Sequence, residues 1–393
     1  MAAPEPQAAP PWLAKRLQQA GGAVPFSTYM AWVLHDPDHG AYGAGRLRIG
    51  PAGDFATSPS LGPDFAALLA PQVAAWLEAL GEGPLALLEA GPGEGSLAAD
   101  LAAALASGWP QLAQRTTLVL LEPNPGMVAR QRQRLADCPL PLRWSSFAAL
   151  AQDPPQGVLL AHEVLDALAV ERIVSTGDGW CRQEVALSPA GALELRAGER
   201  LAAAEQPELE RLGLWPPGPG RPAGWSSERH PGLGPWLRQA AAALRRGHLL
   251  VIDYALEARR YYHPARSSGT LMAYRQQVAS GDPLQEPGQW DLTAHLCLES
   301  LEAAALAAGW REVGGCRQGQ ALLALGLAQR LHGLQAGSPA DLPDLLRRRE
   351  ALLRLVDPHA LGEFRWQAFH RGCDLPTPAF LREPPASPSS PMV

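Results

Sequence analysis

The sequence predicts an α/β fold in which helices cover a mainly parallel sheet, and two observations lead to this prediction. First, short apolar runs alternate with helical segments from residue 85 onward, a pattern typical of β-α-β units. Second, an amphipathic helix expected over 299–310 is followed by two short apolar runs within 311–328, which we interpret as a closing antiparallel hairpin. A nicotinamide-binding Rossmann domain would end with another parallel strand instead.

The strands of this sheet are expected where apolar runs are bounded by turn residues. A continuous apolar run predicts a strand that is buried on both faces, as strands of parallel sheets are. Helices are expected between the strands, and the one over 234–247 ends at a glycine. The predicted parallel strands are 85–90, 116–122, 141–146, 157–163 and 248–254.

Two further regions precede and interrupt the sheet. Helical patterns over 12–19, continuing at 29–34, and over 64–80 are separated by a loop rich in glycine and proline. Residues 169–231 alternate apolar and polar side chains around glycine turns, which predicts a small antiparallel insertion. The expected organisation is a disordered tail at 1–11, an N-terminal helical cap with its loop at 12–80, a Rossmann-like domain at 81–168 and 232–330, the inserted lobe at 169–231, a helical extension at 331–381 and a disordered tail at 382–393.

The composition restricts the class of protein. The chain has 393 residues, 47% of them apolar, which is enough for about two lobes, and its net charge of −6 comes from intermixed charges. No basic patch indicates nucleic acid or anionic membrane as a partner. The five cysteines are scattered without metal-ligand spacing, so we expect no structural metal and a reducing compartment. With no secretory signal and no long apolar run, we expect a soluble cytoplasmic protein without membrane insertion; its oligomeric state is open, a homodimer included.

The strongest local motif is E-A-G-P-G-E-G, which lies where the first predicted strand gives way to a helix. Glycines let such a turn pack tightly and let the backbone approach a ligand. The spacing G-x-G-x-G differs from the G-x-G-x-x-G of dinucleotide-binding turns, and N–H groups at the start of the helix can receive a carboxylate. We therefore expect Glu89, Gly91, Pro92, Gly93 and Gly95 to bind S-adenosylmethionine; the alternative is a tight strand-to-helix connection without a ligand.

Two further segments are expected to hold the rest of this cofactor. Glu122 ends the second strand, where a carboxylate can accept hydrogen bonds from both ribose hydroxyls. Ser145, Ser146 and Phe147 follow the third strand, where the adenine would lie. For these three residues, an ordinary loop is the alternative interpretation.

Several stretches between residues 26 and 327 occur together in the order of one known family, and the chain resembles the MidA family. This family includes the mitochondrial complex I assembly factor that dimethylates a protein arginine. The resemblance implies a class I methyltransferase fold, with a Rossmann-like seven-stranded sheet, an N-terminal helical cap and a small antiparallel insertion. The stretches are FSTYMAWVLHDPDHGAYG, GDFATSPS, LEAGPGEGSL, HEVLDALAV, VIDYA, GTLMAYR, DLTAH and QGQALLALGL.

The resemblance also implies candidate residues for the methyl acceptor. Asp54, Thr57 and Ser58 lie in the stretch that resembles the family's loop over cofactor and acceptor; a polar turn is the alternative. Glu163 and Asp166 follow the fourth strand, and two carboxylates suit a guanidinium, which presents a planar fork of donors. Asp166 could instead cap the next segment.

Three further residues near the predicted acceptor side are candidates. His295 is a candidate acid or base at neutral pH, or a structural histidine. Asp253 and Tyr254 end the fifth strand and border the expected acceptor channel, or belong only to the sheet edge.

The chain departs from the family on this same side. It has His162 where the family usually has asparagine, Ala255 in place of glycine, Met272 in place of arginine, and HLCL in place of HVDF from His295 onward. The predicted cofactor motif is intact, so the departures concern the acceptor.

The resulting functional expectation is an S-adenosylmethionine-dependent methyltransferase that acts on a protein arginine in a respiratory or NDH-type complex subunit. The alternatives are a methyltransferase for a small molecule or another side chain, and a non-catalytic assembly factor that retains the fold. Intact Glu89, Gly91, Gly93 and Glu122 speak against the latter. The glycine spacing disfavours an NAD-dependent oxidoreductase.

Overall fold

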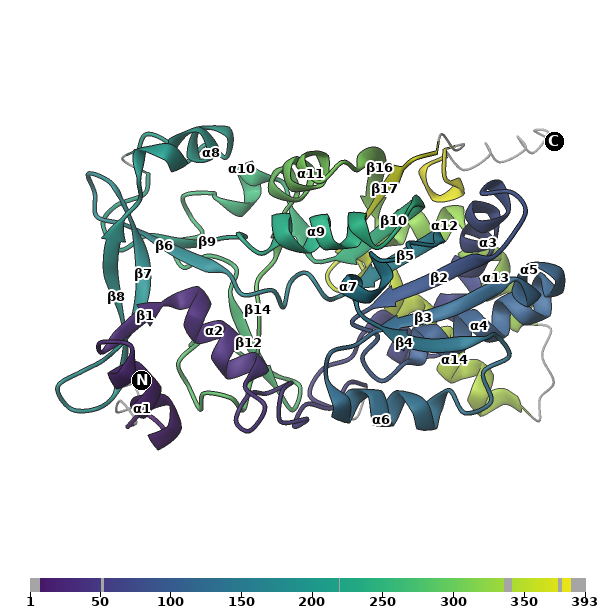
Figure 1. The fold of residues 1–393 in the computed structure, drawn as a ribbon, viewed down its shortest axis with the longest axis horizontal. Coiled ribbons are helices and arrows are strands. Elements are labelled where there is room, and N and C mark those ends of the chain that lie inside the picture. The colour runs from purple at the N-terminus through teal and green to yellow at the C-terminus, as the bar shows by residue number, and fades with distance from the viewer. Residues whose placement is uncertain (1–7, 51–52, 219, 336–340, 374–376, 383–393) are drawn as a thin grey trace, which may run out of the picture. The chain divides into compact units, whose positions relative to one another are not determined.

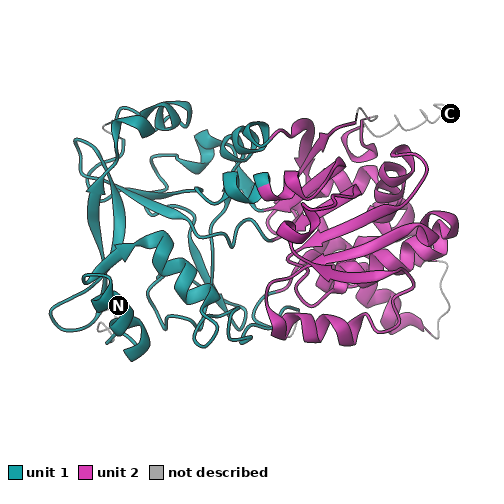
Figure 2. Ribbon diagram, in the orientation of Figure 1, with its two compact units in different colours: residues 1–55, 164–238, 254–308 teal, residues 56–163, 239–253, 309–393 magenta. Residues whose placement is uncertain are grey.

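The computed structural model describes residues 8–50, 53–218, 220–335, 341–373 and 377–382. Within it the chain forms two compact units, shown in teal and magenta in Figure 2. Unit 1 comprises residues 1–55, 164–238 and 254–308, and unit 2 comprises 56–163, 239–253 and 309–393. The two predicted tails fall largely outside the described residues, and helix α1 already begins at Pro11.

Unit 2 contains a seven-stranded sheet in the order β16-β17-β10-β5-β2-β3-β4 (Figure 1). The five strands from β10 to β4 are parallel, and β17 is antiparallel to both β10 and β16. Every residue of β2 and β5 is buried, as continuous apolar runs require. The strands are β2 Leu85–Ala90, β3 Thr116–Leu121, β4 Leu142–Ser145, β5 Gln156–His162, β10 Arg246–Asp253, β16 Arg311–Arg317 and β17 Arg365–Arg371.

The predicted parallel strands are therefore confirmed, but the closing hairpin was placed wrongly. Residues 318–324, which we expected to form a glycine and glutamine turn and the start of the second strand, are helix α12, and the antiparallel strand is β17, which follows α14 and η4. The run ALLAL consists of strong helix formers without a β-branched residue, so it folds as a helix.

Helices of unit 2 pack on this sheet and on each other. Helix α3 packs against β5, β10, α4 and α14, and α4 packs against β3. Asp64, the first residue of α3, is 3% exposed and binds Arg330 of α13 and Arg348 of α14, which fastens the C-terminal helices to α3. The helices are α3 Asp64–Ala79, α4 Ser96–Gly108, α5 Pro110–Gln114, α6 Pro125–Arg134, α7 Phe147–Leu150, α12 Gln318–Ala324, α13 Leu327–Leu334, α14 Leu342–Leu355 and the short 3-10 helices η1 Ser58–Leu61, η4 Leu361–Glu363 and η5 Ala379–Leu381; α9 Leu233–Ala242 begins in unit 1 and ends in unit 2.

Unit 1 contains two antiparallel sheets and one short parallel pair, and the strands within 169–231, where we predicted an antiparallel insertion, belong to the larger sheet. Its larger sheet has the order β1-β7-β6-β9, with β8 on the other side of β7, and a smaller sheet has the order β13-β12-β14. Strands β11 and β15 form a further two-residue pair. The strands are β1 Ala23–Pro25, β6 Glu171–Ser175, β7 Trp180–Leu187, β8 Leu193–Arg200, β9 Ser226–Arg229, β11 Ala255–Leu256, β12 Met272–Arg275, β13 Val278–Ser280, β14 Asp291–Thr293 and β15 Leu296–Cys297.

Two apolar clusters form the core of unit 1. One brings α1 and α2 together with residues of β7 and β12, around Phe26 and Tyr29. The other gathers α8 and α10 around Trp180 and Trp225. The helices of this unit are α1 Pro11–Gln19, α2 Phe26–His35, α8 Gln206–Arg211, α10 Ala258–Tyr261, α11 Leu298–Ala307 and the 3-10 helix η2 Ala203–Glu205.

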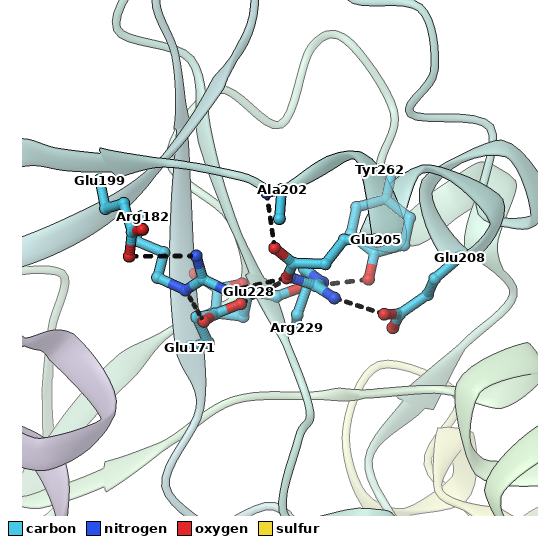
Figure 3. A network of polar contacts seen from close by, with 9 residues as sticks. All are labelled: Glu171, Arg182, Glu199, Ala202, Glu205, Glu208, Glu228, Arg229 and Tyr262. Atoms are coloured by element: carbon cyan, nitrogen blue, oxygen red, sulfur yellow. Dashed lines mark hydrogen bonds and ion pairs between the residues drawn. The ribbon is translucent and has the colours of Figure 1, made fainter.

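An ion-pair network ties the larger sheet of unit 1 to α8 (Figure 3). Arg229 of β9 binds Glu171 at 2.6 Å, Glu205 at 2.7 Å and also Glu208. Arg182 of β7 binds the same Glu171 and Glu205, at 2.6 and 2.9 Å. Because these two arginines share two carboxylates, the network fixes the insertion locally; we assign it a structural role.

Among the described residues, no helix has the length and apolarity needed to cross a membrane.

Candidate functional site

The glycine-rich turn between β2 and α4 has a backbone that only glycine adopts readily. Gly91, Gly93 and Gly95 have φ angles of +58°, +53° and +79°, in the left-handed region. The amide of Gly91 donates to the carbonyl oxygen of Leu121 at 3.1 Å, which holds the turn beside the end of β3. The three glycines predicted from the sequence therefore meet a backbone requirement.

Glu89 lies in β2 just before this turn and is buried, with 4% exposed. Burial raises the pKa of its carboxyl to about 8, against a hydrogen bond from the amide of Ala98 that lowers it. Its Oε2 atom has no hydrogen-bond partner among the described residues. A buried acceptor without a partner fits a ligand that brings a donor or a positive charge, such as the ammonium group of an amino acid.

Glu122, directly after β3, is held by two hydrogen bonds. Its Oε1 accepts from the amide of Asn124 at 2.8 Å, and its Oε2 accepts from Nε2 of Gln131 at 3.2 Å. Burial raises the pKa of Glu122, and these two hydrogen bonds oppose that shift. The carboxylate is thus oriented before any ligand binds.

Gln131 of α6 is a residue that sequence reasoning missed. Its side chain is fully buried, and its Nε2 also donates to the carbonyl oxygen of Gly93 at 2.8 Å. Its Oε1 accepts from the indole Nε1 of Trp144 in β4 at 2.9 Å. One amide therefore links the glycine turn, Glu122 and β4. In the sequence it stands in a polar run, ARQRQR, where nothing distinguishes it from its exposed neighbours.

Two of the residues predicted around the adenine occupy the start of α7. The hydroxyl of Ser146 accepts a hydrogen bond from the amide of Ala149 at 3.2 Å and so caps this helix. Phe147, the first residue of α7, is half-buried. Their contact with the adenine stays a prediction.

The predicted loop over the cofactor and acceptor divides between the two units. In unit 2, Ser58 is fully buried and its hydroxyl accepts from Nε2 of Gln318 at 3.0 Å, while Thr57 precedes η1 and bonds with Ser60. In unit 1, Asp54 accepts from the amides of Arg48 and Gln276 at 2.8 and 3.0 Å. These contacts fix the loop, and a role in binding the cofactor stays a prediction for all three.

The end of β5 carries backbone strain. Glu163 has a φ angle of +50°, a conformation that costs about 1 to 3 kcal/mol for a residue other than glycine and that concentrates at functional sites. Its amide donates to the carbonyl oxygen of Ile252 at 2.9 Å. Its neighbour His162 packs edge-on against Phe65, and burial lowers the pKa of His162 to about 3, so the ring is neutral.

The acceptor candidates Asp166 and His295 belong to unit 1. Asp166 is 5% exposed, and burial raises the pKa of its carboxyl to about 7. His295 stacks on Tyr254 with ring centroids 5.3 Å apart, and its amide donates to Oγ1 of Thr270 at 3.1 Å. Burial, together with Arg266, lowers the pKa of His295 to about 4, so its ring is neutral at pH 7 and is a weaker base than an ordinary histidine.

Most of the remaining positions that depart from the MidA family lie on short strands of unit 1, and Leu298 begins α11. Ala255 pairs with Leu296 in the β11–β15 ladder, and Met272 pairs with Thr293 in the β12–β14 ladder. Asp253 ends β10 in unit 2 and is 1% exposed. In the part of the chain that the structure describes, no cluster of three or more histidine, cysteine or acidic side chains is placed to hold a metal ion.

Comparisons with known proteins agree with this arrangement. The model of a family described as "Putative S-adenosyl-L-methionine-dependent methyltransferase" matches residues 68–315. A crystal structure from Burkholderia thailandensis with bound S-adenosyl-homocysteine is 32% identical, covers 94% of both chains and superposes with a TM-score of 0.82. A second structure from the same organism is 33% identical, covers 94% of this chain and 93% of its own, and has a TM-score of 0.80.

Curated relatives are named protein arginine methyltransferases. The mitochondrial NDUFAF7 homolog of Drosophila melanogaster is 29% identical over 92% of this chain and 85% of its own length. The mitochondrial NDUFAF7 of Danio rerio is 25% identical over 89% of this chain and 83% of its own length. Our prediction of a cytoplasmic location is contradicted by these mitochondrial relatives. The cysteine pattern on which it partly rested indicates a reducing environment and does not identify a compartment.

Proposed function

Because the chain belongs to the family of S-adenosyl-L-methionine-dependent methyltransferases, we propose that it transfers the methyl group of this cofactor to an arginine of a protein. The family, the α/β methyltransferase fold and the cofactor that we predicted from the sequence are confirmed by the family match and by the relative that binds S-adenosyl-homocysteine. The chain is an S-adenosylmethionine-dependent methyltransferase. Our proposal concerns the methyl acceptor, which we infer to be an arginine.

We assign the cofactor to the residues around the glycine turn of unit 2. The turn with Gly91, Gly93 and Gly95 would receive the amino-acid part of the cofactor, with Pro92 stiffening it and with Glu89 facing the ammonium group. Glu122 would accept hydrogen bonds from the ribose hydroxyls, because two hydrogen bonds already orient its carboxylate. Ser146 and Phe147 would lie along the adenine. When bound, the cofactor supplies an electrophilic methyl group.

The observation that carries the arginine proposal is the buried carboxyl of Asp166. A carboxyl that is 5% exposed is costly to ionise, and a guanidinium that binds it stabilises the ionised form. Glu163 supplies a second carboxyl three positions earlier in the chain. His295 stays our candidate acid or base on the resemblance to the MidA family, and its lowered pKa makes it a weak base at neutral pH. The names of the curated relatives support the same acceptor. On the resemblance to the MidA family, we propose that the protein substrate is a respiratory or NDH-type complex subunit.

The experiment is label transfer. The full chain is incubated with methyl-labelled cofactor and a lysate of a strain that lacks this protein, and mass spectrometry locates the label. We expect label on arginine, and we expect Glu163→Gln and Asp166→Asn variants to bind S-adenosyl-homocysteine as the wild type does while transfer falls about 100-fold or more. Label on lysine or on a small molecule would refute the arginine acceptor. Wild-type transfer by both variants would refute the assigned roles.

A further inference from the structure

A second buried acid lies in the part of unit 1 that holds Asp166. Asp291 begins β14 and is 2% exposed. The segment of Asp166 runs beside β14, because the carbonyl oxygen of Asp166 accepts a hydrogen bond from the amide of Ala294 at 3.1 Å. On the other side, Asp291 pairs with Tyr274 of β12. Directly paired residues of an antiparallel ladder point to the same face, so the Asp291 carboxyl and the Tyr274 ring are neighbours.

The groups that face Asp291 are acids and tyrosines. Asp166 and Asp54 repel its negative charge, the hydroxyl of Tyr42 hydrogen-bonds to it, and Tyr274 lies close enough for both Asp166 and Asp291 to affect its titration. Burial, with this repulsion second, raises the pKa of Asp291 to about 8, and burial raises that of Asp166 to about 7. At pH 7 the Asp291 carboxyl is therefore mainly protonated, and Asp166 is near the midpoint of its titration.

One carboxyl oxygen of Asp291 makes no hydrogen bond within the described part of the fold. Its Oδ1 is buried and has no hydrogen-bond partner among the described residues. A buried polar atom without a partner costs about 1 to 3 kcal/mol, and a second acid nearby adds repulsion when both ionise. A fold that needed these two side chains only for packing would be more stable with apolar residues there. The arrangement is therefore explained better by a ligand than by packing.

A planar cation with several donors satisfies both acids at once. A guanidinium presents five N–H donors in a rigid fork and can grip more than one carboxylate, whereas an ammonium is a compact point charge. An aromatic ring beside such a site adds a favourable interaction with a cation. Tyr274, which is half-buried, supplies that ring.

We propose that Asp166 and Asp291, called here the acid pair, form the binding site for the guanidinium of the methyl acceptor, and that the cation displaces a proton from the pair when it binds. This proposal rests on the proposed arginine acceptor and adds Asp291 to the carboxyl groups assigned to that acceptor above. The step breaks the O–H bond of one acid, which becomes a carboxylate, and a buffer base binds the released proton. The bound guanidinium keeps its charge.

The test is isothermal titration calorimetry on the full chain with saturating S-adenosyl-homocysteine. The probe is Nα-acetyl-arginine amide, titrated near pH 6.5 in buffers with different ionisation enthalpies, so that the number of protons released per bound probe is measured directly. We expect between a half and one proton released by the wild type, and at least tenfold weaker binding of Nα-acetyl-lysine amide. This measurement needs no variant.

Variants then assign the effect to the acid pair. Asp291→Asn is expected to weaken binding of the arginine probe at least tenfold and to reduce the proton release to less than half. The matched control is Asp282→Asn, an exposed aspartate nine residues earlier whose side chain accepts from the amide of Leu284, a contact that asparagine keeps; it should bind as the wild type does. Thermal unfolding and S-adenosyl-homocysteine affinity, whose assigned residues lie in unit 2, establish that each variant is folded.

Three results would overturn the proposal: no binding of the arginine probe by the wild type at its solubility limit, binding without proton release, or an unchanged affinity in folded Asp291→Asn. These outcomes are separate from failure of the arginine acceptor itself. If label transfer marks arginine while Asp291→Asn binds the probe as the wild type does, the acceptor stands and the acid pair is refuted. If label transfer marks another residue type, the proposed function fails first.

Discussion

Replacing Gln131 by leucine tests whether the amide that joins the glycine turn, Glu122 and Trp144 prepares the cofactor site. Leucine fills a similar volume on the buried side of α6 but makes none of the three hydrogen bonds, which measure 2.8, 3.2 and 2.9 Å. The two bonds to neutral partners contribute about 1 kcal/mol each and the one to the carboxyl about 2 kcal/mol. Burial of the apolar leucine offsets about 1 kcal/mol of this loss. The free energy of unfolding should therefore fall by about 3 kcal/mol.

The same variant should weaken cofactor binding. Without Gln131, the Glu122 carboxylate loses the hydrogen bond to its Oε2 and keeps the one from the amide of Asn124 to its Oε1, so its orientation is less restricted. When an oriented hydrogen-bond acceptor such as this carboxylate becomes mobile, the affinity for the cofactor falls about tenfold, or by about 1.4 kcal/mol. Equilibrium unfolding in urea measures the stability change, and calorimetric titration with S-adenosyl-homocysteine measures the affinity.

A matched control separates local preparation of the site from a general effect on α6. Gln133→Leu changes an exposed glutamine two positions along the same helix and should alter stability by less than about 0.5 kcal/mol, with no change in affinity. If Gln131→Leu loses stability but binds S-adenosyl-homocysteine within twofold of the wild type, the amide only supports packing, and our account of the site is wrong.

Three other substitutions test buried charge and strain. Because the pKa of Glu89 is raised to about 8, the native state keeps a proton that the unfolded chain loses near the ordinary pKa of a glutamate. The free energy of unfolding should therefore fall by up to about 1.4 kcal/mol per pH unit between about pH 5 and pH 8. Urea unfolding of Glu89→Gln should show a flatter dependence of stability on pH. Asp64→Asn leaves Arg330 and Arg348, each about one-third exposed, without their carboxylate, and should lower the unfolding free energy by about 2 kcal/mol. Glu163→Gly removes left-handed strain and should be as stable as the wild type or up to about 1 kcal/mol more stable, while label transfer falls about 100-fold; full transfer would show that this carboxylate is dispensable.

The parallel half of the sheet could be predicted because its strands are buried on both faces. Strands such as β2 and β5 are then apolar over most of their length, and such runs stand out in the sequence. Strand β17 gave no such signal. Its sequence RWQAFHR mixes charged and apolar residues, and it pairs with β16 only after α12, α13 and α14 have intervened. The antiparallel closure was therefore expected correctly but assigned to a run of helix-forming residues.

The candidate site likewise contains one part that backbone geometry determines and another that depends on contacts between side chains. The turn from Gly91 to Gly95 could be predicted because three left-handed φ angles restrict the residue type directly. Gln131 could not, because its role depends on which side of α6 is buried and on three partners from separate elements. Asp291 could not be joined to Asp166 for a similar reason, since a backbone hydrogen bond from Ala294 to Asp166 brings together two segments that are far apart in the sequence.

This division bears on the departure at Met272. Met272 and Tyr274 lie two positions apart on β12, so their side chains point to the same face of the sheet. Asp291 on the neighbouring strand β14 lies on this face as well. An arginine, which the MidA family usually has at this position, would bring a positive charge to that face; methionine brings none. Asp291 thus lacks a cation from its strand neighbour, and its charge must be neutralised by a proton or by a ligand. In our proposal the methyl donor is held by the glycine turn, whose backbone few residue types can form, whereas recognition of the acceptor depends on single side chains such as these. Recognition of the acceptor can then change while the fold and the donor site stay intact.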